Sequence, residues 1–305
     1  MFVDILLAVT PSEICQWAAE VAFAFARRHE ARLHILHVCG PPEYSWSDVP
    51  FLHNTGEMDK AKAAIEERFR GHLSDLKNYS IEVVAGQPEM EILRAARKKN
   101  TDLIIMGPNE KAVRAGRLST WGQTGSVLER VGQRAQCPIM IVPRAVPPER
   151  LSFANIVMAT DFSEQADCAL AYAGQLAKFY KAHLHVLHVV DVGSQFERLK
   201  VSQEEVEELI GDAFLRMDKG FAPTLKGVDH TFEVWEGVPY VEILKLARRR
   251  NGDLVLMAHH TKAQDPEKAY LGSTVAQVAL RSACPTISIN RHFDLRCETY
   301  VLKER

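Results

Sequence analysis

The sequence predicts an α/β protein made of two tandem domains, each an open five-stranded parallel sheet with helices on both faces. The chain contains one unit twice: an offset of 151 residues aligns Ile5–Val9 with Ile156–Thr160, and Leu33–Val38 with Leu184–Val189. Short continuous apolar runs, typical of parallel strands that are buried on both faces, alternate with segments of helical periodicity. The 305 residues suffice for two domains that each bury a core.

The boundaries of the domains follow from the repeat. Beyond the fourth strand the offset falls to 147, which aligns Gly125-Ser126 with Gly272-Ser273, so the length difference lies in one loop. So long a period indicates complete domains rather than a solenoid of short repeats. We expect domain 1 at residues 1–144, a proline-containing linker at 145–152, domain 2 at 153–292 and a polar tail at 293–305.

Each domain is expected to follow the order β-α-β-α-β-α-β-α-β. In the first copy, helices are expected from the N-cap candidate Ser12, on the stripe from Met58 to Leu73, and from Pro88 and Ser126. In the second copy, Ser202-Gln-Glu-Glu205 is a capping-box signature before an apolar stripe. The strands of the first copy are expected at residues 3–9, 33–38, 81–85, 103–106 and 139–142.

A parallel sheet of this kind binds ligands beyond the carboxyl ends of its strands, where the strand order reverses. The segment Gly272-Ser273-Thr274 lies there, at an expected helix start, where backbone N–H groups and the helix dipole favour a phosphate group. The same residues could instead form only a turn and an N-cap. Both interpretations stay open on these residues alone.

Composition excludes several classes of protein. The net charge of −2 gives no electrostatic reason to expect nucleic acid or an anionic membrane as partner. No apolar stretch reaches the length of a membrane span, and the N-terminus has no signal-peptide pattern. The six cysteines have no CxxC spacing, as expected for reduced thiols. We therefore expect a cytoplasmic protein.

Many segments, in order and spacing, resemble the universal stress protein family in its tandem two-domain form. They include Asn155–Ser163 at the first strand of copy two, Leu-His-Val at 36–38 and 187–189, Gly-x-Pro before the third helix, Asp-Leu-Ile-Ile-Met-Gly at 102–107, and Gly-Ser-Val-Leu-Glu-Arg-Val followed by Cys-Pro at 125–138. The resemblance implies a Rossmann-like fold of the adenine-nucleotide alpha-hydrolase type. It also implies that the domains pair within the chain through their last strands, with a homodimer of chains possible.

Members of that family that bind ATP carry an Asp after the first strand, a Val at the end of the second, and a Gly-x-x-Gly pair followed by Gly with Ser or Thr. By resemblance, copy two keeps the Asp, the Val and the final Gly with Ser, but it lacks the Gly-x-x-Gly pair. Ala258 and Thr261 stand where the early glycines belong, and Lys262 and Lys268 are candidate phosphate partners. The candidate residues for an adenine nucleotide are Asp161, Val189, Ala258, Thr261, Gly272, Ser273 and Thr274.

Copy one departs further from the pattern. It has Thr10 at the Asp position, Glu110 in place of the second glycine, and a longer loop. Glu110 adds negative charge beside a polyphosphate, and the loss of the Asp removes base recognition. The weaker candidate set is Val38, Gly107, Gly125 and Ser126, with Lys111, Arg114 and Arg117 available to a different anion.

We expect no metal site. His183 and His185 share one face of a strand while His188 points to the other, so the three imidazoles do not converge on one ion from the strand alone. His37 and His188 occupy equivalent strand positions, which suggests a packing role. The aromatic and proline-rich segment 40–56 either covers the protein's own cleft or docks a partner.

Three functions are weighed. The favoured one is a non-catalytic stress-response protein that binds ATP, ADP or AMP in domain 2, with the role of Mg²⁺ unknown. The alternative is a scaffold of the same family that has lost nucleotide binding and acts through dimer or partner surfaces. A weak ATPase is the third, with Asp265 in the loop as a candidate to orient water, although no acid lies at a fixed offset from Gly272 that must do so. No nucleophile elbow or paired catalytic motif occurs in the sequence.

Overall fold

The computed structural model describes residues 2–10, 15–40, 56–107, 127–192, 202–259 and 273–290. It divides into two compact units, unit 1 from Met1 to Ala145 and unit 2 from Val146 to Arg305. Both are α/β units with parallel sheets, so the predicted fold class is confirmed. The predicted N-cap Ser12, most of the 40–56 segment and the tail 293–305 lie outside the described residues.

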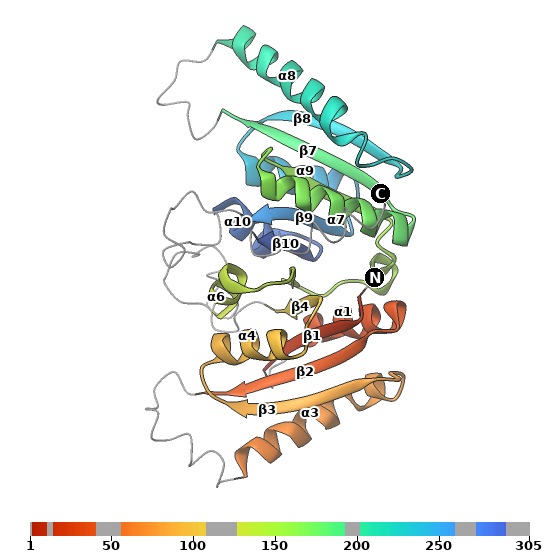
Figure 1. Ribbon diagram of the computed structural model, residues 1–305, viewed down its shortest axis with the longest axis vertical. Helices are drawn as coiled ribbons and strands as arrows, with labels where there is room; N and C mark the ends of the chain where they lie inside the picture. Colours follow the sequence, from red (N-terminus) through yellow and green to blue (C-terminus); the bar gives the residue numbers. More distant parts are fainter. Residues whose placement is uncertain are drawn as a thin grey trace. The chain divides into compact units, whose positions relative to one another are not determined.

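Unit 1 contains one parallel sheet with the strand order β3-β2-β1-β4-β5 (Figure 1). Its second helix lies along its edge strand β3, and its last two helices contact each other. Its elements are β1 (Asp4–Val9), α1 (Cys15–His29), β2 (Arg32–Cys39), α3 (Glu57–Leu73), β3 (Tyr79–Ala85), α4 (Pro88–Lys98), β4 (Leu103–Met106), α6 (Val127–Arg134) and β5 (Ile139–Ile141).

Unit 2 repeats this topology, with the strand order β10-β9-β6-β7-β8, all parallel. The predicted linker residues Pro148–Ser152 form a short 3-10 helix, η2, that belongs to this unit. Its other elements are β6 (Asn155–Thr160), α7 (Glu164–Tyr180), β7 (His183–Asp191), α8 (Gln203–Phe221), β8 (His230–Gly237), α9 (Pro239–Arg249), β9 (Leu254–His259), α10 (Ser273–Arg281) and β10 (Thr286–Asn290).

The central strands form the cores. Ile5, Leu6 and Leu7 in β1 are fully buried, as are Ile156 and Val157 in β6. This explains the continuous apolar runs, because both faces of a central parallel strand are covered by helices. Crossovers between parallel strands are right-handed, which sets the first two helices of each unit on one face of the sheet and the last two on the other.

Local sequence signals define the helix starts. Ser163 caps α7 by accepting a hydrogen bond from the Ala166 amide at 3.2 Å. Ser202 and Glu205 form the predicted capping box of α8. Pro88 and Pro239 occupy the first turn of α4 and α9, where a missing N–H costs no helical hydrogen bond.

The backbone two residues before each of these prolines has a conformation that favours glycine. Gly86 has a φ of 154° and Gly237 a φ of 140°. A Cβ added at Gly237 would lie 2.9 Å from Cγ of Glu242, one turn into α9. The Gly-x-Pro sequence therefore encodes a strand-to-helix turn that a larger residue would distort.

Candidate functional site

The strand order reverses between β6 and β9 in unit 2, and between β1 and β4 in unit 1. In a doubly wound sheet, this is where the loops diverge and leave room for a ligand beyond the carboxyl ends of the strands. In unit 2 the predicted residues come from the elements around that point. Asp161 follows β6, Val189 lies in β7, Ala258 lies in β9 and Thr274 lies in the first turn of α10.

Asp161 is exposed, and its orientation is set by the start of α7. Its Oδ1 accepts hydrogen bonds from the Ser163 amide at 3.1 Å and from the Ser163 hydroxyl at 2.7 Å. The same hydroxyl oxygen accepts from Ala166, so the carboxylate and the helix cap form one unit. The result is a negatively charged acceptor held at the end of β6, suited to the N–H or O–H groups of a ligand.

His188 supports the same turn from the neighbouring strand. Its Nδ1 lies 3.0 Å from the carbonyl oxygen of Thr160, and because a carbonyl only accepts, Nδ1 carries the proton and donates. Burial lowers the pKa of His188, with smaller opposing effects from the Thr160 hydrogen bond and from Asp161. The equivalent His37 in unit 1 binds the Val9 carbonyl in the same way, at 2.9 Å.

The remaining predicted residues of unit 2 divide into two groups. The side chains of Val189, Ala258 and Thr274 are half-buried at the carboxyl end of the sheet. Ser273 is the first residue of α10, so the phosphate-binding hypothesis depends on the amino end of a nine-residue helix. The residues Thr261, Lys262, Asp265, Lys268 and Gly272 lie outside the described residues.

Unit 1 differs at the equivalent point. Its Val38 and Gly107 are half-buried at the ends of β2 and β4, while Gly125, Ser126, Glu110, Lys111, Arg114 and Arg117 lie outside the described residues. Thr10 occupies the position of Asp161, and its hydroxyl lies 3.1 Å from Sγ of Cys15. The Thr10 amide also donates to this sulfur, at 3.2 Å. Unit 1 therefore presents a neutral hydroxyl where unit 2 presents a carboxylate.

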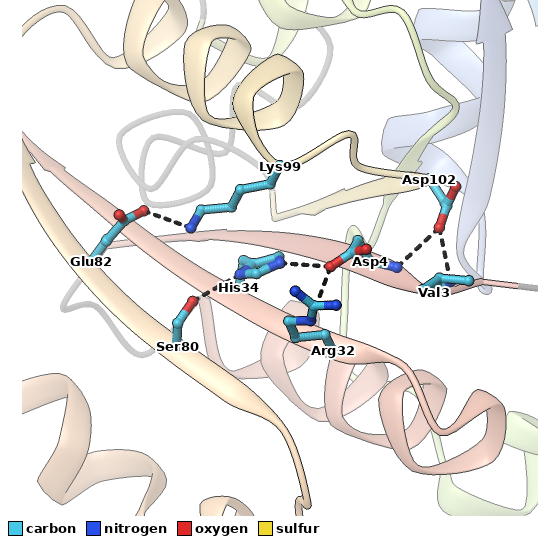
Figure 2. A network of polar contacts seen from close by, with 8 residues as sticks. All are labelled: Val3, Asp4, Arg32, His34, Ser80, Glu82, Lys99 and Asp102. Atoms are coloured by element: carbon cyan, nitrogen blue, oxygen red, sulfur yellow. Dashed lines mark hydrogen bonds and ion pairs between the residues drawn. The ribbon is translucent and has the colours of Figure 1, made fainter.

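A second polar cluster lies at the opposite, amino ends of the strands in unit 1 (Figure 2). His34 is buried and bridges two strands: its Nε2 lies 2.9 Å from Oδ1 of Asp4, and its Nδ1 lies 2.8 Å from Oγ of Ser80. Since a carboxylate only accepts, Nε2 of the neutral ring donates a hydrogen bond to Asp4, and Nδ1 accepts a hydrogen bond from the Ser80 hydroxyl. This order of groups is that of a Ser-His-Asp relay, but it lies at the amino ends of the strands, whereas a doubly wound sheet binds ligands beyond their carboxyl ends.

The rest of this cluster indicates a role in strand alignment. Arg32 lies 3.3 Å from Asp4, and Asp102 accepts hydrogen bonds from the amides of Val3 and Asp4 at 2.8 and 2.9 Å (Figure 2). In unit 2, Asp253 likewise binds the Asn155 amide, and His185 lies 3.1 Å from the hydroxyl of Thr231. No motif in the sequence indicates this cluster, although the offset of 151 residues pairs His34 with His185.

His183 and His185 both bind residues of their own unit. His183 pairs with Asp229 at 2.9 Å and lies 3.2 Å from Thr231, on the same face as His185. Within the described ranges, no three His, Cys, Asp or Glu side chains are grouped as a metal site would require. Among the described helices, none combines the length and apolarity needed to cross a membrane.

Comparison with known proteins adds the family context. The model of the universal stress protein family matches residues 1–143 and 152–289. A universal stress protein of Methanocaldococcus jannaschii is 32% identical over 144 residues, which are 46% of this chain and 83% of the relative. One from Thermus aquaticus is 34% identical over 146 residues, 47% of this chain and 99% of the relative. Each relative therefore has about the length of one unit.

One solved structure is similar over almost the whole chain. A universal stress protein from Archaeoglobus fulgidus has a TM-score of 0.67 at 22% sequence identity, and the match covers 95% of this chain and 97% of that one. At that identity the similarity establishes the fold. The two-unit arrangement of elements along the chain therefore has a counterpart of nearly equal extent.

Proposed function

Because the chain belongs to the universal stress protein family, we propose that it is a non-catalytic stress-response protein that binds an adenine nucleotide in unit 2. The observation that supports this most is the exposed carboxylate of Asp161, which the cap of α7 holds at the end of β6. Val189 is the proposed neighbour of the base and ribose on the adjacent strand β7. A carboxylate there accepts hydrogen bonds from the polar edge of a nucleoside.

The phosphates are proposed to lie at the start of α10. Free backbone N–H groups and the positive end of the helix dipole attract anions there, and Ser273 and Thr274 begin this helix. Ala258 and Thr261 restrict how closely the loop backbone approaches a phosphate, because each carries a Cβ that glycine lacks. Lys262 and Lys268 are the proposed cationic partners, and a role for Mg²⁺ is left to experiment.

Unit 1 is proposed not to bind the same ligand. Its hydroxyl at Thr10 faces the Cys15 sulfur and has no negative charge, so it offers a weaker acceptor to a base or ribose. Glu110 adds a carboxylate to the loop in which a polyphosphate would lie. The function of unit 1 is then structural or directed to a different anion.

One observation favours a second candidate function. Both early glycines of the family's ATP signature are replaced in unit 2, by Ala258 and Thr261. A scaffold that has lost its nucleotide and acts through dimer or partner surfaces would tolerate such replacements. Both proposals include a cytoplasmic location and a homodimer of whole chains. Light scattering after gel filtration measures the oligomeric state.

A thermal-shift screen separates the two candidates. We expect ATP, ADP or AMP to raise the melting temperature of the protein, because a ligand that binds only the folded state stabilises it. Guanine nucleotides and inorganic triphosphate are the matched controls for base recognition. Equal melting temperatures with and without every nucleotide, at millimolar concentration, would favour the scaffold. A phosphate-release assay with Mg²⁺ tests the proposal that no hydrolysis occurs.

Substitution of Asp161 tests the site itself. The Asp161→Ala variant is expected to weaken ATP binding by about tenfold to a hundredfold, since a hydrogen bond to a charged group contributes about 1.5–3 kcal/mol. The equivalent substitution in unit 1, Thr10→Ala, is expected to leave ATP affinity unchanged. Titration calorimetry measures both. An unchanged affinity in the Asp161→Ala variant would show that the nucleotide binds elsewhere.

A further inference from the structure

The residue after Asp161 has an unusual backbone conformation. Phe162 has a φ of 61°, in the left-handed region that is unfavourable for a residue with a Cβ. Four other described residues of this kind occur in equivalent pairs at helix ends, Glu30 with Lys181 and Asn100 with Asn251, and a fifth, Phe153, ends the 3-10 helix η2. Phe162 has no such pair, and a proline, as at the equivalent position 11, could not adopt this φ. An unfavourable conformation beside a proposed ligand site requires an explanation in the surrounding contacts.

Contacts from three other elements hold Phe162 in this conformation. The buried hydroxyl of Thr160, at the end of β6, accepts a hydrogen bond from the Phe162 amide at 3.1 Å. The Phe162 ring lies 4.2 Å from the His188 ring on β7 and 5.7 Å from the Phe221 ring at the end of α8, measured between ring centroids. The turn is therefore held by contacts with β6, β7 and α8.

Arg216 on α8 makes two further contacts with Phe162. Its Nη2 donates a hydrogen bond to the Phe162 carbonyl oxygen at 3.2 Å. Its guanidinium carbon also lies 4.4 Å from the centroid of the Phe162 ring, within the range of a cation–π interaction. One side chain therefore contacts both the backbone and the ring of Phe162, and the planar guanidinium does so with less loss of side-chain freedom than the flexible ammonium of a lysine.

We infer that Arg216 is a positioning residue of the proposed nucleotide site, which keeps the 160–163 turn in the one shape that directs Asp161 toward the ligand. This inference rests on the function proposed above. The carboxylate of Asp161 accepts hydrogen bonds from Ser163, and Phe162 lies between these two residues in the chain. A change of φ at Phe162 therefore rotates Asp161 relative to α7. Arg216 acts on the ligand only through that rotation.

The charges around Arg216 fit this role. Burial raises the pKa of Asp167 on α7, and Arg216 opposes that change while Glu164 adds to it. Arg216 also lowers the pKa of His188, whereas Asp161 raises it. The guanidinium thus acts electrostatically on Asp167 of α7 and on His188 of β7, two elements that flank the turn.

A double-mutant cycle tests the inference. Arg216→Met keeps the aliphatic length of the side chain but removes the hydrogen bond and the charge. We expect it to weaken ATP binding about fivefold when Asp161 is present, and less than about twofold in the Asp161→Ala background, because coupled residues are not additive. Arg216→Lys is expected to restore little of the loss. Arg68→Met is the matched control on α3, because Arg68 lies between the buried Ile65 and Phe69 as Arg216 lies between the buried Ala213 and Met217, and it should leave ATP affinity unchanged.

Equal losses in both backgrounds would overturn the inference, because Arg216 would then act independently of Asp161, for example by direct contact with phosphate. A second measurement needs no ligand. In the Arg216→Met variant, the amides of Ser163 and Ala166, which bond to Asp161 and Ser163, are expected to exchange hydrogen about tenfold faster, while amides in the middle of β6 keep their rate. Unchanged exchange at Ser163 and Ala166 would also overturn it. If the wild-type protein binds no nucleotide, the proposed function fails, and hydrogen exchange alone decides whether Arg216 holds the turn.

Discussion

Two buried imidazoles occupy equivalent positions and have different surroundings. His34 faces the carboxylate of Asp4, whereas Asn155 occupies the position equivalent to Asp4 in unit 2, and His185 lies near His183 and Arg250. Burial lowers the pKa of both rings, and in His34 the Asp4 contact opposes this effect. Burial is the main cause that lowers the pKa of His185 to about 4; His183 and Arg250 add to this effect, and Asp229 opposes it. The carboxylate of Asp4 thus opposes the effect of burial on His34, and an amide occupies that position in unit 2.

The lowered pKa of His185 predicts a loss of stability in acid. The unfolded chain binds a proton at His185 below about pH 6.5, and the folded chain does so only near pH 4. The contribution to the free energy of unfolding is therefore complete above pH 6.5 and is lost as the pH falls toward 4. We expect it to be on the order of 2 kcal/mol.

Urea unfolding of the wild type and of His185→Asn at pH 7 and pH 4.5 measures this contribution. The asparagine amide can still bond to Thr231 but does not titrate, so the variant should lose less stability between the two pH values. Burial also lowers the pKa of His29 to about 4. This residue adds equally to the pH dependence of the free energy of unfolding in both proteins, so its effect cancels in the difference. Identical pH slopes for the two proteins would contradict the assignment.

At the scale of elements, the two units join their last two helices differently. In unit 1 the buried Glu89 at the start of α4 forms an ion pair with Arg130 on α6. In unit 2 the equivalent of Glu89 is Tyr240 on α9, and Arg281 on α10 lies 5.3 Å from the centre of its ring. These contacts hold α6 against α4 in unit 1 and α10 against α9 in unit 2.

Arg130→Met is expected to destabilise the protein by about 1–3 kcal/mol, because it leaves the buried carboxylate of Glu89 without its cation. The double variant Glu89→Gln/Arg130→Met should recover part of that loss. Arg281→Met in unit 2 is the control, with an expected loss of about 0.5–1 kcal/mol for an exposed cation–π contact. Chemical unfolding followed by circular dichroism gives the three values, and an Arg130→Met effect no larger than that of Arg281→Met would contradict the ion-pair account.

The cap of α8 matters for the site because this helix carries Arg216. Ser202 accepts a hydrogen bond from the Glu205 amide at 3.2 Å, and the Glu205 carboxylate accepts from the Ser202 amide at 2.7 Å. Ser202→Ala is expected to lower the free energy of unfolding by about 1 kcal/mol, and Ser202→Gly by only a few tenths. The same urea titrations measure both, and equal losses for alanine and glycine would indicate that the cap is not the cause.

The elements could be predicted from the sequence where one local rule determines them. The buried strand β1 is a continuous apolar run, and the capping box of α8 is visible as Ser202-Gln-Glu-Glu205. The contact between Arg216 and Phe162 could not be predicted, since it depends on how α8 packs beside a turn that lies 54 positions earlier in the chain. The positive φ of Phe162 was also missed, because Asp-Phe-Ser contains neither glycine nor asparagine at the strained position.

For the whole molecule, duplication produced two units with the same topology but different groups at the end of the first strand. Asp161 and its Ser163 contacts occur in unit 2, while Thr10 pairs with Cys15 in unit 1. We therefore expect one adenine nucleotide per chain of 305 residues. Native mass spectrometry at saturating ATP counts the bound ligands, and two equivalent nucleotides per chain would mean that Thr10 and Glu110 do not prevent binding.

The most direct test of the central proposal is a crystal structure of the full chain grown with saturating ATP. We expect density for one nucleotide, with its base and ribose beside Asp161 and Val189 and its phosphates at the first residues of α10. Density at the carboxyl ends of β1 and β4 alone, or none in either unit, would contradict the proposal that unit 2 carries the nucleotide site.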